Sequence, residues 1–459
     1  MKYLSTRGGI QPIPFSQAVM MGLATDGGLT LPVSIPTVTT ATLKHWADLE
    51  FIPLALEIIS LFVAEDDIPR HDLDRLIHKA FASFTHPEIT PLVTVGNHHV
   101  LELFHGPTLA FKDVALQLLG NLFEYLLQRD GGTLNILGAT SGDTGSAAIH
   151  GVRGKKGMEI FILHPHRRVS PIQERQMTTV LDANVHNIAI EGTFDDGQAI
   201  VKKLFNDLAF KKKYHLGAVN SINWARIVAQ VVYYFYAWGR LAHGDATRPV
   251  EFSVPTGNFG DIFAGYIAKR MGLPMGKLLL ATNRNDILTR FFSTGSYRIG
   301  QAHPTISPSM DIQVSSNFER YLYYLLHEDP VAVGQKMAEL DATGAFQVPR
   351  SVIDAAGEFR ATAVGEEETV TTIRSVHQRY GYLLDPHTAV GFAAAKETPG
   401  MVCLATAHPA KFGDAVKQAI GREPQRPPLL DGLEQRPYRC QVMAASVQAV
   451  RDFIAGQLG

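Results

Sequence analysis

The stretch Leu134-Asn-Ile-Leu-Gly-Ala-Thr-Ser-Gly-Asp-Thr-Gly-Ser-Ala-Ala-Ile-His150 passes from an apolar run through a glycine-rich loop into a segment of helical period. The run Leu134–Leu137 has the length and apolar character of a buried parallel strand. Strand, loop and helix in this order form the repeating unit of doubly wound α/β architecture. In such sheets ligands bind beyond the carboxyl ends of the strands. We therefore expect an α/β fold with a binding loop at residues 137–145.

The same alternation recurs in both directions along the chain. Apolar, β-branched runs of strand length occur at Glu159–Leu163, Asn187–Ile190, Val250–Val254 and Met401–Leu404. Segments of helical period separate or follow them, at Val114–Gln128, Asp195–Phe210, Ala225–Leu241 and Asp261–Arg270. This rhythm predicts two doubly wound αβα domains.

The first ninety residues lack this rhythm and are helix-rich from Thr42 to Phe84. A chain of 459 residues has room for several domains. We predict an N-terminal helix-rich domain at residues 1–90, a large α/β domain at 91–128 and 245–459, and a small α/β domain at 129–244. The helix-rich stretch Phe318–Val376 carries no motif and receives no function.

Composition and charge exclude several classes of protein. Hydrophobic residues make up 46% of the chain and charged residues 19%, which indicates a large buried interior rather than disorder. The 42 basic and 44 acidic residues give a net charge of −2, so no overall field attracts nucleic acid. Eighteen histidines are present without a His-Glu-x-x-His motif, and we predict no metal.

Cysteine usage and hydropathy indicate the compartment. Cys403 and Cys440 cannot build a disulfide framework, which favours a reducing environment. The N-terminus lacks the apolar core of a signal peptide. The most apolar segment, Ile227–Trp238, is short and contains Gln230. We expect a cytoplasmic protein with no membrane interaction.

Two more loops resemble the first in composition and position. Val254-Pro-Thr-Gly-Asn-Phe-Gly-Asp261 follows an apolar strand and precedes a helix, and its two glycines allow backbone amides to approach an anion closely. The stretch Leu404–Lys411 places Thr406 just past another strand. Residues 137–145 form neither a Walker A loop nor a dinucleotide fingerprint, which argues against nucleotide hydrolysis. Tight turns with capping hydroxyls would have the same composition.

A lysine indicates which ligand these loops could bind. In Phe104-His-Gly-Pro-Thr-Leu-Ala-Phe-Lys-Asp-Val-Ala115, Lys112 lies between Phe111 and the apolar start of a helix. A desolvated lysine is more often uncharged and can bond covalently to a carbonyl group. Pyridoxal phosphate requires a lysine, a phosphate cradle and a partner for its ring nitrogen. The three loops and Lys112 together predict this cofactor.

The chain resembles the threonine synthase family, in the long form of enterobacteria and fungi. Six motifs carry the resemblance in the expected order: Gly22–Leu29, His105–Asp113, Gly138–Gly145, Asn220–Arg226, Pro255–Asp261 and Ala407–Lys411. The resemblance implies the fold of the tryptophan synthase β subunit (pyridoxal-phosphate fold type II). It also implies conversion of the small molecule O-phospho-L-homoserine, with water, into L-threonine and phosphate by a monomer or homodimer.

The resemblance assigns cofactor contacts residue by residue. Lys112 matches the lysine that carries the cofactor and then acts as a base. Thr406 matches the hydroxyl residue that faces the pyridine nitrogen. The loop that holds the cofactor phosphate, mainly through backbone amides, matches Gly257, Asn258, Phe259, Gly260 and Asp261. All of these residues belong to the predicted large, cofactor-binding domain. Lys112 lies in its first segment, 91–128, and the others lie in its second segment, 245–459.

The resemblance also assigns substrate contacts, mainly in the small domain. The substrate α-carboxylate is expected at Thr140, Ser141, Gly142, Asp143 and Thr144. Cysteine synthase relatives carry asparagine in place of Asp143, so we expect this carboxylate to cap a helix or to point away. The substrate phosphate is expected at Asn220, Ser221, Asn223 and Arg226, with Lys155 or Lys411 as helpers. Guanidinium suits that role because it binds phosphate oxygens bidentately.

Two alternatives use the same residues. A relative could remove phosphate from the same substrate and release 2-oxobutyrate, or deaminate threonine or serine. A cofactor-binding or metabolite-binding regulatory protein without turnover is the alternative from another class, and the presence of Lys112 argues against it.

Overall fold

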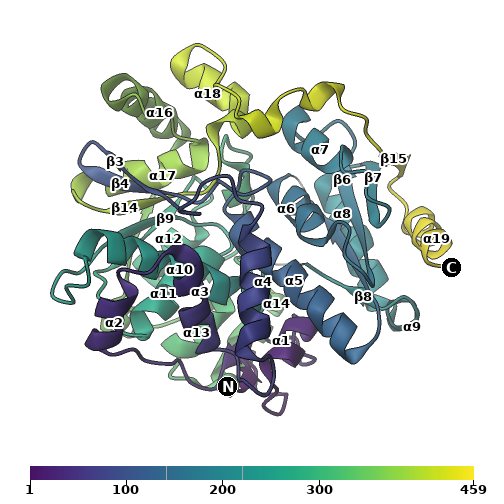
Figure 1. Ribbon diagram of the computed structural model, residues 1–459, viewed down its shortest axis with the longest axis horizontal. Coiled ribbons are helices and arrows are strands. Elements are labelled where there is room, and N and C mark those ends of the chain that lie inside the picture. Colours follow the sequence, from purple (N-terminus) through teal and green to yellow (C-terminus); the bar gives the residue numbers. More distant parts are fainter. Residues whose placement is uncertain (141, 220) are drawn as a thin grey trace. The chain divides into compact units, whose positions relative to one another are not determined.

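The computed structural model describes residues 1–140, 142–219 and 221–459. The chain forms two compact units (Figure 1). The first consists of Met1–His105 and Ser221–Pro424, and the second of Gly106–Asn220 and Gln425–Gly459. Each unit has its own sheet and its own core, and each is described separately.

The first unit is built on a six-stranded sheet. Its order is β13 (Phe359–Ala363), β10 (Leu278–Thr282), β9 (Phe252–Pro255), β14 (Val402–Ala405), β4 (His98–Glu102) and β3 (Leu92–Val95). All neighbours are parallel except β3 and β4, which form an antiparallel hairpin at the edge. Strands β9, β10 and β14 are buried along their whole length, as their continuous apolar runs require.

Helices cover this sheet, and further helices and short strands complete the first unit. The long apolar helix α10 (Trp224–Ala242) packs on α11 (Gly260–Arg270), while α17 (Pro386–Ala394) contacts β9, β10 and β14. The remaining elements are α12 (Ile287–Thr294), β11 (Ser296–Arg298), α13 (Phe318–Leu325), α14 (Pro330–Thr343), β12 (Ala345–Gln347), α15 (Arg350–Ala356), α16 (Glu366–Tyr380) and α18 (Gly413–Ile420), with short 3₁₀ turns between some of them. The stretch Phe318–Val376 is thus helix-rich as predicted, and it also supplies the edge strand β13.

The N-terminal residues are helical and belong to the first unit. Strands β1 (Tyr3–Ser5) and β2 (Thr30–Pro32) pair antiparallel. Helix α3 (Phe51–Ser60) packs on α10 and on α4 (Arg70–Phe81). The ring of Phe51 meets Tyr236 of α10 and Phe81 of α4 edge-on, at 5.5 and 5.1 Å between centroids. The helices of this region are α1 (Phe15–Met21), α2 (Thr40–Trp46), α3 (Phe51–Ser60) and α4 (Arg70–Phe81).

The second unit has an all-parallel sheet of five strands. Its order is β15 (Gln441–Ala444), β7 (Val185–Glu191), β6 (Met158–Pro165), β5 (Leu134–Ala139) and β8 (Leu216–Gly217). Helices α8 (Phe194–Asn206) and α19 (Val447–Leu458) share one core with the central strands. The other helices are α5 (Lys112–Asp130), α6 (Asp143–Val152), α7 (Pro171–Thr178) and α9 (Leu208–Lys213). The two mainly parallel sheets with helices confirm the predicted α/β class.

The units divide the chain at positions other than the predicted domain boundaries. Helix α5 lies in the second unit because it packs closely on α6: a Cβ on Gly120 would stand 1.9 Å from the carbonyl oxygen of Gly151. The last 35 residues also lie there, because β15 pairs with β7 and α19 joins the core. Residues 221–244 and the N-terminal ninety belong to the first unit. Neither packing has a signature in local periodicity.

Within the described ranges, no helix is both long and apolar enough to cross a membrane. In the same ranges, no group of three or more His, Cys, Asp or Glu side chains is arranged to hold a metal ion.

Candidate active site

Lys112 is the first residue of α5, and its side chain is 11% exposed. Its amine lies 4.0 Å from Oδ2 of Asp143 and 4.7 Å from the centroid of the Phe111 ring. The next residue, Asp113, accepts hydrogen bonds from the backbone N–H and the hydroxyl of Thr108, at 2.8 and 2.7 Å. Lys112 thus begins a helix whose preceding loop is fixed by its neighbour.

The predicted carboxylate loop lies between β5 and α6. The hydroxyl of Thr140 accepts hydrogen bonds from the backbone N–H groups of Gly142 and Gly145, at 3.1 and 3.0 Å. Thr140 therefore shapes the loop, and Thr144 lies half-buried in the first turn of α6. The backbone N–H groups of a first helical turn lack partners within their helix and favour an anion. Ser141 lies outside the described residues.

Asp143 was expected to cap a helix or to point away from the substrate carboxylate, but its side chain lies beside Lys112. Its Oδ1 accepts a 2.8 Å hydrogen bond from the side-chain amide of Gln173, which orients the carboxylate so that Oδ2 faces Lys112. It lies in the first turn of α6, while the capping residue is Gly142. The carboxylate at this position thus has an ammonium neighbour, which compensates its charge.

The predicted phosphate loop lies in the first unit, between β9 and α11. Phe259 has a φ of 62°, and its ring is buried against Phe318 at 5.4 Å between centroids. A Cβ on Gly257 would stand 2.8 Å from the carbonyl oxygen of Ser309. The loop therefore needs glycine at this close approach, and α11 begins with the backbone N–H groups of its first turn available to a phosphate.

Asp261 stands in the first turn of α11, where its side chain is held by two tyrosines. Oδ1 accepts hydrogen bonds from the hydroxyls of Tyr233 and Tyr234, at 2.5 and 3.0 Å. Burial raises the pKa of both tyrosines well above the ordinary value, so both stay protonated donors. Because these tyrosines hold the Asp261 side chain, the groups that this loop can offer to an anion are its backbone N–H groups. Glycines at close approach and a helix start fit the phosphate of the predicted cofactor.

The run that follows position 220 begins α10. Asn223 caps this helix by accepting from the backbone N–H of Ala225 at 3.1 Å, and its amide donates to the carbonyl of Val19 at 2.8 Å. The hydroxyl of Ser221 contacts that of Ser316 at 2.6 Å. Asn220 lies outside the described residues.

Arg226 is a buried cation with open hydrogen-bonding positions. Its side chain is in the first turn of α10 and the residue is 5% exposed. Its Nε and Nη1 atoms have no hydrogen-bond partner among the described residues. Burial lowers the pKa of Arg226 to about 10, only partly offset by nearby Tyr233. A buried guanidinium without a counter-ion is costly, and an anionic ligand would remove that cost.

Thr406 follows β14, and two buried residues at the start of α17, the capping Asp385 and Thr388 in the first turn, fix its backbone. Its N–H donates to the hydroxyl of Thr388 at 3.2 Å, and that hydroxyl in turn donates to the carboxylate of Asp385. Lys411 is 1% exposed in a 3₁₀ turn, Pro409–Phe412, capped by His408. Sequence reasoning missed Asp385 and Thr388, whose only local signal is the Asp-Pro start of a helix.

Sequence reasoning also missed a segment that joins two predicted loops of the first unit. The amide of Asn317 donates to the carbonyls of Ser221 and Asn258, both at 3.1 Å. The hydroxyl of Ser315 donates to the carbonyl of Gly257 at 2.8 Å, and Arg320 donates to that of Ile222 at 2.5 Å. The polar run Ser315-Ser316-Asn317 before a helix was the available signal.

Comparison with known proteins defines the class and then the family. The model of the pyridoxal-phosphate-dependent enzymes matches residues 85–405, so this is the class of the protein, and the predicted cofactor is confirmed. The models for the threonine synthase N terminus and the threonine synthase C-terminal region match residues 2–81 and 388–454. The chain belongs to the threonine synthase family.

Individual relatives agree over nearly the whole chain. Threonine synthase of Pseudomonas aeruginosa is 49% identical, with 99% of this chain and 98% of that one covered. That of Saccharomyces cerevisiae is also 49% identical, over 91% of this chain and 89% of its own. The crystal structure of threonine synthase from Brucella melitensis with bound pyridoxal phosphate superposes with a TM-score of 0.97 at 48% identity, covering 100% and 99% of the two chains. The predicted fold type II is confirmed.

Proposed function

We propose that the protein converts O-phospho-L-homoserine and water into L-threonine and phosphate. The observation that carries this substrate is Arg226, because a buried guanidinium with open donors requires an anion. The phosphate group of the substrate supplies that anion and becomes the leaving group. Membership in the threonine synthase family supports the same reaction.

Lys112 acts as the proton-transferring residue in this proposal. Pyridoxal phosphate, when bound, serves as the electron sink that stabilises negative charge on the substrate carbons. The Nζ atom of Lys112 removes the proton from Cα, and the carboxylate of Asp143, 4.0 Å away, stabilises the resulting ammonium. Gln173 keeps that carboxylate turned toward Lys112.

The remaining residues bind and orient the substrate. A second deprotonation, at Cβ, lets the electrons of that C–H bond expel phosphate from Cγ. Arg226 donates to the departing phosphate oxygens and offsets their charge. Protonation at Cγ, addition of the hydroxyl group of water at Cβ and return of a proton to Cα complete the product. The amides of residues 142–144 bind the substrate α-carboxylate at the start of α6.

The cofactor contacts are proposed in the same way. Backbone N–H groups of residues 257–261 hold the cofactor phosphate at the start of α11. Thr406 places its hydroxyl at the pyridine nitrogen, while Asp385 and Thr388 fix the Thr406 backbone. Lys411 helps to bind the substrate phosphate. The monomeric or homodimeric state, the cytoplasmic location and the three predicted domains stay predictions.

Product analysis tests the reaction. The holoenzyme is supplied with O-phospho-L-homoserine, and phosphate, threonine and 2-oxobutyrate are measured in one sample. We expect equal amounts of phosphate and threonine. Release of phosphate together with 2-oxobutyrate would contradict the final addition of water. Absence of any phosphate would contradict the assignment of O-phospho-L-homoserine as the substrate and would favour a regulatory protein.

A further inference from the structure

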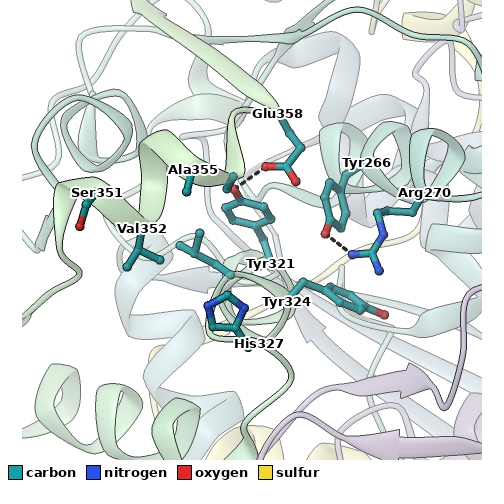
Figure 2. Close-up of a pocket in the computed structure, with 11 residues that line it drawn as sticks. Tyr266, Arg270, Tyr321, Tyr324, His327, Ser351, Val352, Ala355 and Glu358 are labelled. Atoms are coloured by element: carbon teal, nitrogen blue, oxygen red, sulfur yellow. Dashed lines mark hydrogen bonds between the residues drawn. The ribbon is translucent and has the colours of Figure 1, made fainter.

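The first unit contains a cavity of about 380 Å³ that no sequence motif marks. Figure 2 shows its lining, which comes from the end of α11, from α13 and the loop that follows it, from α15, and from Glu358 just before β13. This volume lies in the range of small-molecule sites. The cavity is at the amino end of β13, whereas the predicted phosphate loop follows the carboxyl end of parallel β9. It is therefore a place distinct from that loop.

Arg270 brings a positive charge to this cavity. Its Nη1 donates to the hydroxyl of Tyr266 at 2.7 Å, and its guanidinium lies 5.1 Å from the centroid of the Tyr324 ring (Figure 2). Among the residues that the structure describes, no carboxylate lies within ion-pair distance of it. Its other donors are thus available to an anionic group.

Glu358 brings a negative charge to the same cavity. It accepts one long hydrogen bond, of 3.3 Å, from the hydroxyl of Tyr321 (Figure 2). Burial raises the pKa of its carboxyl, against the opposing effects of hydrogen bonding, including that from Tyr321, and of the charges of Lys269 and Arg270. In the described part of the chain Glu358 and Arg270 form no ion pair with each other, although both line the cavity. Two opposite charges are therefore held apart.

The remaining lining is aromatic and aliphatic. Tyr324 brings an aromatic ring to the cavity (Figure 2). Leu325, Val352 and Ala355 line it with apolar groups. An anion alone would leave Glu358 without an oppositely charged contact in the cavity, and a cation alone would leave Arg270 without one. A zwitterion satisfies both, because its carboxylate can take the donors of Arg270 and its ammonium can donate to Glu358. An apolar side chain then contacts the aliphatic residues.

We propose that this cavity binds an L-α-amino acid with an apolar side chain, at a site separate from the catalytic lysine. Carboxylate and ammonium are recognised together, by Arg270 and Glu358. Tyr321, which contacts Glu358, also packs against Phe259 of the phosphate loop at 5.8 Å between ring centroids. An occupant thus lies one side chain from the cofactor loop.

Calorimetric titration of the holoenzyme with L-valine tests this proposal, with valinamide and isovalerate as analogues that lack the carboxylate charge and the ammonium. We expect L-valine to bind without changing the visible absorption of the cofactor, and each analogue to bind about tenfold more weakly or worse. Arg270→Gln and Glu358→Gln should each lower the affinity for L-valine by at least about tenfold. Arg422→Gln is the control: this exposed arginine contacts His377 at 3.3 Å, and the variant should bind L-valine as the unsubstituted protein does.

Three results would overturn the proposal. The first is the absence of any heat of binding at L-valine concentrations of about 10 mM, because a dissociation constant above that value is too weak for a specific site. The second is equal binding of L-valine and both analogues, which requires no variant and so holds even if a substitution disturbs folding. The third is unchanged binding in both cavity variants.

Discussion

Thr388 accepts a 3.2 Å hydrogen bond through its hydroxyl from the backbone N–H of Thr406. The same hydroxyl donates to Asp385, which caps α17, so the start of one helix fixes the backbone at the end of β14. All three residues are buried. The residue proposed to meet the cofactor ring is thus positioned by a contact 18 residues away in the sequence.

Thr388→Val should weaken cofactor binding and lower stability. The valine keeps the shape of threonine but removes the acceptor, so the N–H of Thr406 and the carboxylate of Asp385 each lose a partner. We expect a loss of about 1–3 kcal/mol in the free energy of unfolding, measured in urea, and a higher dissociation constant for pyridoxal phosphate. Thr388→Ser retains the hydroxyl and should stay close to the original protein. Equal cofactor affinity in both variants would refute this positioning role.

Gly257→Ala should reduce cofactor affinity by at least about tenfold, because the new Cβ would stand 2.8 Å from the backbone oxygen of Ser309 and push the phosphate loop aside. Gly334→Ala is the matched control: this glycine lies within α14, and nothing stands within 4 Å of its Cβ position. The control should retain cofactor affinity and gain about 0.5–1 kcal/mol of stability. Cofactor titration and urea unfolding measure both. The loop assignment fails if the two alanines bind the cofactor alike.

Lys112→Ala should abolish the visible absorption of lysine-bound cofactor and reduce turnover by at least about 100-fold. The fold should persist, because the side chain lies at the start of a helix and is not part of the apolar core. Absorption spectra, circular dichroism and phosphate release are the measurements. Lys112→Arg keeps the positive charge beside Asp143 and should be equally inactive. A coloured, active alanine variant is the result that excludes the assignment.

Arg226→Met should remove a phosphate contact without unfolding the protein. Replacing a buried, unpaired cation with an apolar side chain of similar length should leave the substrate-free holoenzyme at least as stable. We expect KM to rise by about tenfold or more. Inorganic phosphate should raise the melting temperature of the original holoenzyme and have a smaller effect on the variant. Unchanged KM and an unchanged phosphate effect would place the substrate phosphate elsewhere.

His408 should make the protein sensitive to acid. Burial lowers the pKa of His408 to about 4, from an ordinary value of 6.5. Below pH 6.5 the unfolded chain binds this proton and the folded one does not, so stability falls as the pH drops from 6.5 toward 4, by up to about 3 kcal/mol. His408→Asn keeps a cap for Ala410 and should lose this contribution. Parallel pH dependences of the two unfolding free energies would show that folding leaves the pKa of His408 unchanged.

Much of the fold was predictable because buried parallel strands have a continuous apolar run, followed by a glycine-rich loop. This pattern located Gly257–Asp261 and the loop around Gly142, and the apolar surroundings of Lys112, together with these loops, pointed to the amine that we propose as catalytic. The placement of α5 was not predictable, since the close approach of Gly120 and Gly151 depends on two segments that meet only in three dimensions.

The orientation of individual side chains was equally hidden. Gln173, which turns the carboxylate of Asp143 toward Lys112, follows that residue by 30 positions and has no pattern of its own. Asn317 joins two loops about 60 and 100 residues before it. Such contacts set the geometry of a site, whereas local sequence sets only the elements that carry it.

Strand β15 pairs with the edge of β7, although about 250 residues separate the two in the chain. During synthesis on a ribosome, β7 emerges long before its partner and presents an unpaired strand edge, which invites association with other chains. The second unit completes its sheet only after residues 441–444 have been made. Chains that end prematurely before residue 441 would therefore carry this exposed edge permanently, and would be expected to aggregate or to require chaperones.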